Sequence, residues 1–133
     1  MSETMNERPV RRPHPGSMSE PYLELDLQRE LDELQREAAW ASGRNARTLV
    51  KFDDLRVVLT ALKAGARMPA HKTQGRISIE GISGRIRIRA EGRTFDLRPG
   101  GLLALDHGVS HEVEAIEDGA FLLTIAWPRP PAA

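Results

Sequence analysis

Two histidines far apart in the chain, His71 and His111, have side chains with the greatest capacity for chemistry. A neutral imidazole binds transition metals, and it also serves as a general acid or base near neutral pH. His111 alternates with Val109 and Val113, so in a strand its ring points into the protein. Thr73 follows His71 and offers a hydroxyl to a ligand or to the backbone. These residues predict either a ligand or metal site or hydrogen-bonded core histidines.

Two further residues could extend this site. Glu80 shares a strand face with Ser78 by alternation, so an inward orientation of that face would supply a carboxylate beside the two imidazoles. If Ile77 points inward instead, Glu80 points to water, where Arg76 is a possible ion-pair partner. His107 lies in a predicted turn and would reach a ligand only by folding inward.

The composition excludes several classes of function. Nineteen basic and nineteen acidic residues give a formal net charge of zero, which argues against nucleic acid and anionic membranes as partners. The chain has no cysteine, which excludes disulfides and thiolate sites and fits a reducing compartment. We find no apolar run of the roughly 18 residues that a membrane helix needs, and no signal peptide, so we expect a cytoplasmic protein.

The 133 residues fit one domain with short flanking segments. Residues 1–21 are rich in proline and poor in apolar side chains, which predicts a disordered tail. Residues 22–46 are predicted to form a helix and a linker, the helix starting at an Asp26 cap and ending at Gly43. We expect a β-barrel over residues 47–128 and a C-terminal tail over residues 129–133.

Eight short apolar or alternating runs separated by turn residues indicate the strands of this barrel. A chain of this length with so many strands and tight turns favours an all-β jelly-roll barrel preceded by one N-terminal α-helix. The predicted strands are residues 48–52, 55–63, 76–82, 85–90, 95–97, 102–105, 109–116 and 121–127.

Two segments of the chain resemble the motifs of the cupin superfamily. Gly65, His71 and Gly84 have the spacing of the first cupin motif, and Gly108 and His111 have the spacing of the second. The resemblance implies a double-stranded β-helix, a small jelly-roll barrel, of the kind found in small single-domain bacterial cupins of unassigned function. It also implies that the two histidines occupy metal-ligand positions.

The chain departs from the cupin pattern at the remaining ligand positions. Thr73 stands where the motif has its second histidine, and the glutamate position falls at Ile77, or at Ser78 if the spacer is one residue longer. Metal sites in such barrels usually have three or four protein ligands, so His71 and His111 alone form an incomplete set.

Two hypotheses for function follow. In the first, a small cupin binds a small molecule in its barrel through His71, Thr73, Glu80 and His111, without turnover. In the alternative, His71 and His111 hold a divalent metal (Fe, Mn, Ni or Zn), and the protein is a dioxygenase, isomerase or lyase that acts on a small organic acid or phenolic compound, as the resemblance implies. Cupins of this size are commonly homodimers, and open edge strands give a physical motive for pairing, so we also expect a homodimer.

Overall fold

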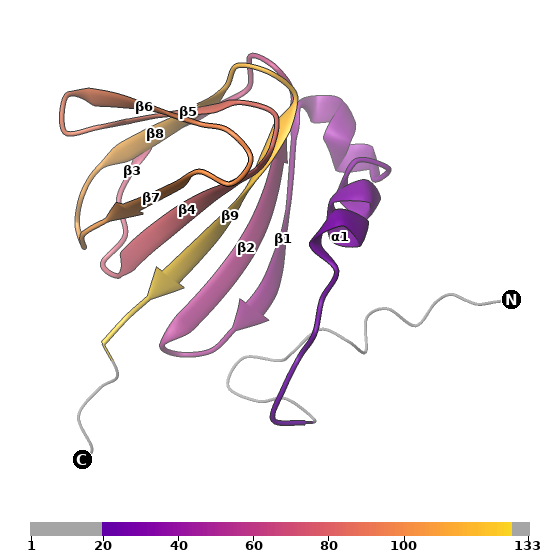
Figure 1. Cartoon of the computed structure of the whole chain (residues 1–133), viewed down its shortest axis with the longest axis horizontal. Helices are drawn as coiled ribbons and strands as arrows, with labels where there is room; N and C mark the ends of the chain where they lie inside the picture. Colours follow the sequence, from indigo (N-terminus) through magenta and orange to yellow (C-terminus); the bar gives the residue numbers. More distant parts are fainter. Residues whose placement is uncertain (1–19, 129–133) are drawn as a thin grey trace, which may run out of the picture.

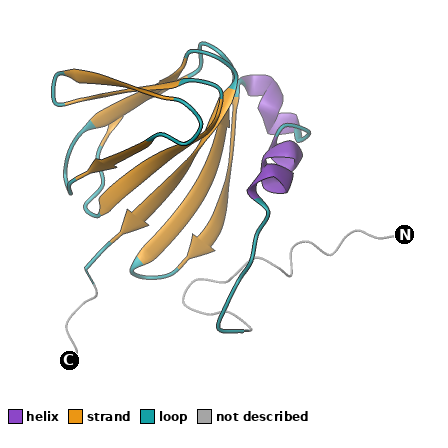
Figure 2. Ribbon diagram, in the orientation of Figure 1, coloured by secondary structure: helices purple, strands orange, loops and turns teal. Residues whose placement is uncertain are grey.

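The computed structural model describes residues 20–128, which form nine strands and two short helices (Figures 1 and 2). Most of the predicted tails, residues 1–21 and 129–133, lies outside the described residues. The elements are α1 (Leu27–Leu34), the 3₁₀ helix η2 (Ala38–Ser42), β1 (Arg44–Lys51), β2 (Leu55–Leu62), β3 (Arg67–His71), β4 (Arg76–Ser83), β5 (Ile86–Ala90), β6 (Arg93–Leu97), β7 (Leu102–Leu105), β8 (His111–Ala115) and β9 (Gly119–Ala126).

The strands form two antiparallel sheets that face each other (Figure 1). One sheet has the order β1-β2-β9-β4-β7 and the other has the order β3-β8-β5-β6. Strands that are neighbours in each sheet come from distant parts of the sequence, as in a jelly roll. The predicted fold class, an all-β jelly-roll barrel with one N-terminal α-helix, is confirmed.

One strand of the structure was not among the predicted ones. This strand is β3, which carries Pro69 and ends at His71. It lies at the edge of its sheet, where a proline without an N–H is tolerated because one side of the strand needs no ladder partner. The register shifts between Met68 and His71, so the strand is irregular at the proline. The first strand also differs, since it begins at Arg44, within the segment predicted as helix and linker.

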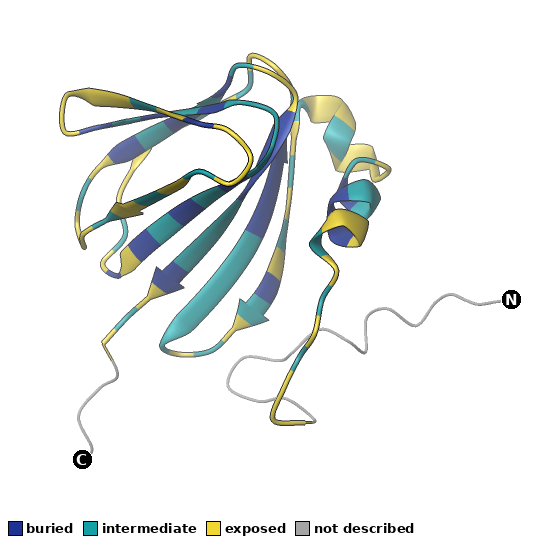
Figure 3. Ribbon diagram, in the orientation of Figure 1, coloured by how far each residue is buried: buried dark blue, intermediate teal, exposed yellow. Residues whose placement is uncertain are grey.

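A hydrophobic core fills the space between the two sheets (Figure 3). Alternate residues of β4 point into it, so that Ile77 and Ile79 are buried while Ser78 and Glu80 lie on the other face. The buried members of this core are Leu62, Ile77, Ile79, Ile86, Ile88, Leu97, Val113, Ala115, Phe121 and Ile125.

The helix α1 covers the outer face of the larger sheet beside β1 and β2 (Figure 2). Asp26 caps it as predicted, because its carboxylate accepts hydrogen bonds from the backbone N–H groups of Gln28 and Arg29. The helix ends at Leu34, earlier than predicted, since Glu37 is extended and the chain restarts as η2. Leu31 and Leu34 pack on this outer face in a second hydrophobic cluster.

Within residues 20–128, neither helix has the length and apolar character that crossing a membrane would require.

Candidate functional site

His71 and His111 meet at one end of the barrel. His71 is the last residue of β3, His111 is the first residue of β8, and the two are direct partners in the antiparallel register. Their ring centroids are 4.4 Å apart and the ring planes are tilted by 55°. We call this end of the barrel, formed by the loops of residues 72–75 and 106–110, the mouth. The structure therefore brings together the two imidazoles that the sequence singled out.

Both rings are oriented by the same local hydrogen bond. The Nδ1 of His71 lies 3.1 Å from the carbonyl oxygen of Pro69, and the Nδ1 of His111 lies 3.2 Å from that of Val109. A carbonyl only accepts, so each Nδ1 carries the proton and donates it. In the neutral rings the Nε2 atoms are then the unprotonated nitrogens, each able to accept a hydrogen bond or to bind a metal.

The environment of His111 keeps its ring neutral. The residue is 3% exposed, and burial lowers the pKa of its imidazole. The hydrogen bond to Val109 opposes this shift, and the nearby charge of His71 adds to it. At neutral pH His111 is therefore an uncharged acceptor at Nε2.

Thr73 lies in the loop that follows His71 and supports the mouth through local hydrogen bonds. Its hydroxyl donates to the carbonyl of Gly75 at 3.0 Å, and its own carbonyl accepts from the N–H of Gly108 at 2.8 Å. The second bond ties together the two loops that precede β4 and β8. Thr73 is thus placed beside the histidines, with its hydroxyl engaged by the backbone.

The structure does not bring Glu80 to the histidines. Ile77 and Ile79 occupy the inner face of β4, so the condition for an inward Glu80 is not met. Glu80 lies instead on the outer face of the larger sheet, in register with Leu122 and Leu102 on its two neighbouring strands.

The side chain of His107, which lies in one of the loops of the mouth, likewise has no contact with His71 or His111 in the described part of the chain. It is exposed, its backbone N–H donates to the Asp106 carboxylate at 2.8 Å, and this hydrogen bond lowers the pKa of Asp106. Asp106 also accepts from Arg76 at 2.9 Å, so these residues form a surface ion-pair group.

Comparison with known proteins bears on the fold. No family model matches the chain, and no curated protein matches it either. Among solved structures, a conserved protein of unknown function from Streptococcus pyogenes has a TM-score of 0.70 and 23% identity, over 90% of this chain and 96% of that one. An RmlC-like cupin from Shewanella frigidimarina has a TM-score of 0.61 and 18% identity, over 65% of this chain and 78% of that one. The chain has the cupin fold. KdgF from Halomonas sp. is also similar, with a TM-score of 0.60 and 22% identity over 66% of this chain and 82% of that one.

The donors at the mouth do not fit a metal site of three or four protein ligands. Among residues 20–128 no group of three or more His, Asp or Glu side chains is placed to hold an ion. The second-histidine position of the motif has the backbone-bonded hydroxyl of Thr73, and the glutamate position has the core side chain of Ile77, which is 5% exposed. Two imidazoles remain, which is fewer than protein metal sites of this kind use.

Arg56 is a residue of the cupin barrel that the sequence reasoning missed. It pairs in register with Ile125, which in turn pairs with Ile77, and both isoleucines belong to the core between the sheets. By alternation Arg56 therefore faces the inside of the barrel near the mouth. Its guanidinium carbon lies 5.4 Å from the ring centroid of Trp127. The available signal was a single charged residue within the otherwise apolar or hydroxylic run of β2.

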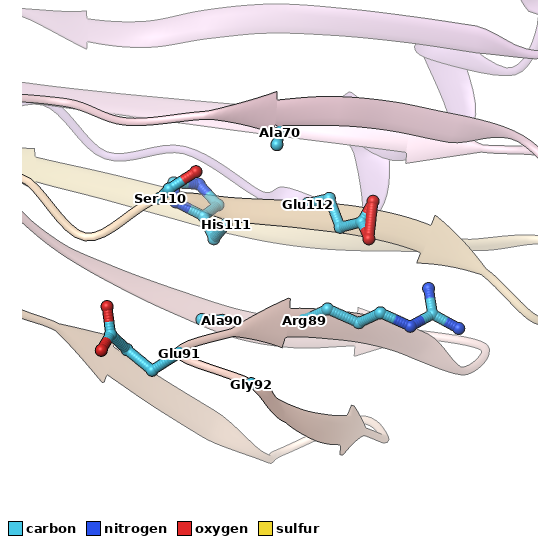
Figure 4. Close-up of a pocket in the computed structure, with 8 residues that line it drawn as sticks. All are labelled: Ala70, Arg89, Ala90, Glu91, Gly92, Ser110, His111 and Glu112. Carbon is cyan, nitrogen blue, oxygen red and sulfur yellow. The ribbon is translucent and has the colours of Figure 1, made fainter.

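A separate pocket of about 300 Å³ lies beside the mouth, over the start of β8 and the turn between β5 and β6 (Figure 4). Ser110 and Glu112 alternate with His111, so this pocket opens on the outer side of the smaller sheet. The Arg89 side chain that borders it is engaged by Glu114 at 3.2 Å. The pocket shares only His111 with the predicted site, and its lining residues are Ala70, Arg89, Ala90, Glu91, Gly92, Ser110, His111 and Glu112.

Proposed function

We propose that this cupin binds a small organic molecule at the mouth of its barrel and has no resident catalytic metal. The observation that carries the proposal is the pair His71 and His111, whose Nδ1 atoms are occupied by backbone carbonyls and whose Nε2 atoms remain acceptors. Ile77 at the glutamate position makes the surroundings apolar. Two Nε2 acceptors beside apolar walls suit a ligand with a hydrogen-bond donor on a carbon skeleton.

The alternative, a metal-dependent cupin enzyme, rests on one specific feature. Hydrogen bonds from Nδ1 to a backbone carbonyl are the arrangement that orients metal-binding histidines in proteins, and both rings have it. His71 and His111 would be the protein ligands, and the ion would supply Lewis-acid or O₂ chemistry on a small acid or phenolic compound. The small number of ligands makes us favour the first proposal.

Metal analysis distinguishes the metal-free binding protein from the metal-dependent enzyme. The full chain is purified without chelators and without a histidine tag, and its Fe, Mn, Ni and Zn contents are measured together with those of His71→Ala and of the matched surface variant His107→Ala. We expect contents well below one ion per chain in all three proteins. Stoichiometric metal in the wild type and in His107→Ala that is lost in His71→Ala would favour the enzyme instead.

Binding is tested directly by ligand-observed NMR with a library of small polar and aromatic compounds. We expect compounds that bind the wild type to lose binding in His71→Ala and to keep it in His107→Ala. Retention of every hit by His71→Ala would refute a role for the histidine pair.

Two further expectations belong to this proposal. A homodimer remains a prediction, supported by the uncovered outer part of the larger sheet, where Leu102 is 64% exposed. A cytoplasmic location also remains a prediction, supported by the absence of cysteine.

A further inference from the structure

Arg56 places a positive charge on the inner face of the barrel. Its partners in the register, Ile125 and Ile77, are 6% and 5% exposed and form the apolar wall next to it. Arginine is rarely directed toward a protein interior unless an acceptor for its N–H groups is present. An apolar wall supplies none, so the position of Arg56 requires an explanation.

In the part of the chain that the structure describes, no acidic side chain neutralises this charge. Within residues 20–128, Arg56 forms no ion pair and no side-chain hydrogen bond, and its Nε is shielded from solvent without an acceptor. Among the described residues, its side chain contacts the ring of Trp127. That contact orients the guanidinium, but it supplies no acceptor for the shielded Nε–H.

Arg56 lies at the same end of the barrel as the histidine pair. The register joins Arg56 through Ile125 to Ile77, at the beginning of β4. β4 begins at Arg76, directly after the short loop that follows His71. A ligand at the mouth that contacts the two imidazoles therefore lies at the end of the barrel where Arg56 faces inward.

We propose that Arg56 anchors a carboxylate group of the ligand, so that the molecule bound at the mouth is a small carboxylic acid with an apolar or aromatic skeleton. This inference rests on the proposed function and names the class of its ligand. The planar guanidinium matches the two oxygens of a carboxylate. Trp127, Ile125 and Ile77 offer apolar contacts to a carbon skeleton, which favours a carboxylic acid over a strongly hydrated phosphate.

The test uses benzoate as the probe and benzamide as its uncharged analogue of the same shape. The chain has two tryptophans, so Trp40→Phe leaves Trp127 as the only tryptophan, and its fluorescence then reports on the surroundings of Arg56. We expect benzoate to change this fluorescence saturably and benzamide to do so at least about tenfold more weakly. Equal responses to the two compounds, or no saturable response to benzoate, would overturn the proposal.

Variants of the full chain assign the effect to the residue. Arg56→Gln is expected to weaken benzoate binding at least about tenfold. Arg56→Lys is expected to weaken it less, since lysine keeps the positive charge but lacks the paired N–H donors of the guanidinium. The matched control is Arg85→Gln, because Arg85 also has a shielded Nε without an acceptor but pairs with Asp96 at 2.6 Å. Unchanged binding in Arg56→Gln, or an equal loss in Arg85→Gln, contradicts the anchor.

A measurement on the unmutated protein covers the case in which Arg56→Gln does not fold. The ¹⁵N and ¹H resonances of the Arg56 Nε–H are expected to shift with benzoate and not with chloride at equal ionic strength. A resonance that responds equally to both salts overturns the anchor.

The same titration on His71→Ala separates this inference from the proposed function. Binding that depends on Arg56 but not on His71 would keep the anchor and reject the histidine contact. Binding that depends on His71 but not on Arg56 would keep the histidine contact and reject the anchor.

Discussion

The exposed ring of His71 lies beside the buried ring of His111, with their centroids 4.4 Å apart. A proton on His111 would lose much of its hydration and would face any charge on its neighbour. His111 is therefore suited to accept a hydrogen bond through an uncharged Nε2, and this state depends on pH.

The stability of the fold is predicted to fall in mild acid because of His111. Its pKa in the folded chain is lowered from the ordinary value of 6.5. Between the folded and unfolded values the unfolded chain binds more protons, so the stabilisation is complete above about pH 6.5 and is lost as the pH falls toward the folded-state pKa. Urea unfolding from pH 8 to pH 5 measures this change. His111→Leu is expected to have a shallower dependence on pH, and an identical dependence in the two proteins would contradict the assignment.

The fold was predictable because most of its strands have apolar or alternating sequences bounded by turn residues. The exception, β3, contains Pro69, and a proline in a short run argues against a strand unless the run is known to lie at a sheet edge. Edge position is a property of the whole topology. The resemblance to the cupin motif nevertheless assigned His71 and His111 to one site, and in the structure the two residues are partners in the register.

The site was less predictable because side chains of a strand alternate between its two faces. A shift of one residue in the register therefore exchanges the inward and outward side chains. From the sequence alone, either Ile77 or Ser78 could face inward. Glu80 lies on the same strand face as Ser78, so its orientation was equally open. The same alternation hides Arg56, since its inward orientation becomes evident only through its register with Ile125. Strand pairing decides which side chains face the inside of a barrel, and the local sequence does not specify that pairing.

Replacing Arg47 is predicted to loosen the helix from the barrel. Arg47 of β1 forms ion pairs with three glutamates of the N-terminal segment, among them Glu30 at 3.1 Å and Glu33 at 2.7 Å, and its side chain is 14% exposed. Arg47→Gln removes the ion pair between Arg47 and Glu30, which is 5% exposed, and should cost about 3 kcal/mol in the free energy of unfolding. Urea unfolding tests this, with Arg76→Gln as the control.

Arg76 is the appropriate comparison because its ion pair with Asp106 joins side chains that are 69% and 63% exposed. We expect no measurable loss in that variant, since exposed pairs are strongly screened. Equal losses in the two variants would show that the burial of the Arg47 cluster has no special importance.

Gly84 is predicted to tolerate no side chain. Its φ is +66°, and a Cβ atom there would lie 2.2 Å from the backbone oxygen of Asp118. Gly84→Ala should cost about 3 kcal/mol or more, because backbone must move and a left-handed conformation is strained. Gly92 has a similar φ of +72° with open space around it, so Gly92→Ala should cost about 1 kcal/mol. Thermal unfolding of the two variants compares these costs, and a smaller loss for Gly84→Ala would contradict the close approach.

Leu102 is predicted to lie in the homodimer contact. It is 64% exposed on the outer part of the larger sheet, away from the strands β1 and β2 that α1 covers. We expect a solution mass of twice the 14.8 kDa chain mass, and a dimer weakened about tenfold or more in Leu102→Lys. Sedimentation velocity measures both. Tyr22→Lys is the control, because Tyr22 is the other large apolar residue that the described chain exposes, at 65%. A monomeric wild type at micromolar concentration would contradict this prediction.

Adding a carboxylate to the inner face of β4 is predicted to create a metal site at the histidine pair. Ile77 faces the barrel interior at the position of the motif glutamate, so Ile77→Glu adds a carboxylate to the two imidazoles and produces a two-histidine, one-carboxylate set. The variant should be less stable without metal, because an unpaired carboxylate is buried. Added Zn²⁺ or Ni²⁺ should then raise its Tm more than it raises that of the wild type. The matched control is Ser78→Glu, which places the same group on the opposite face of the strand. An equal gain in the two variants, or a gain in Ile77→Glu that survives His71→Ala, would show that the metal binds elsewhere.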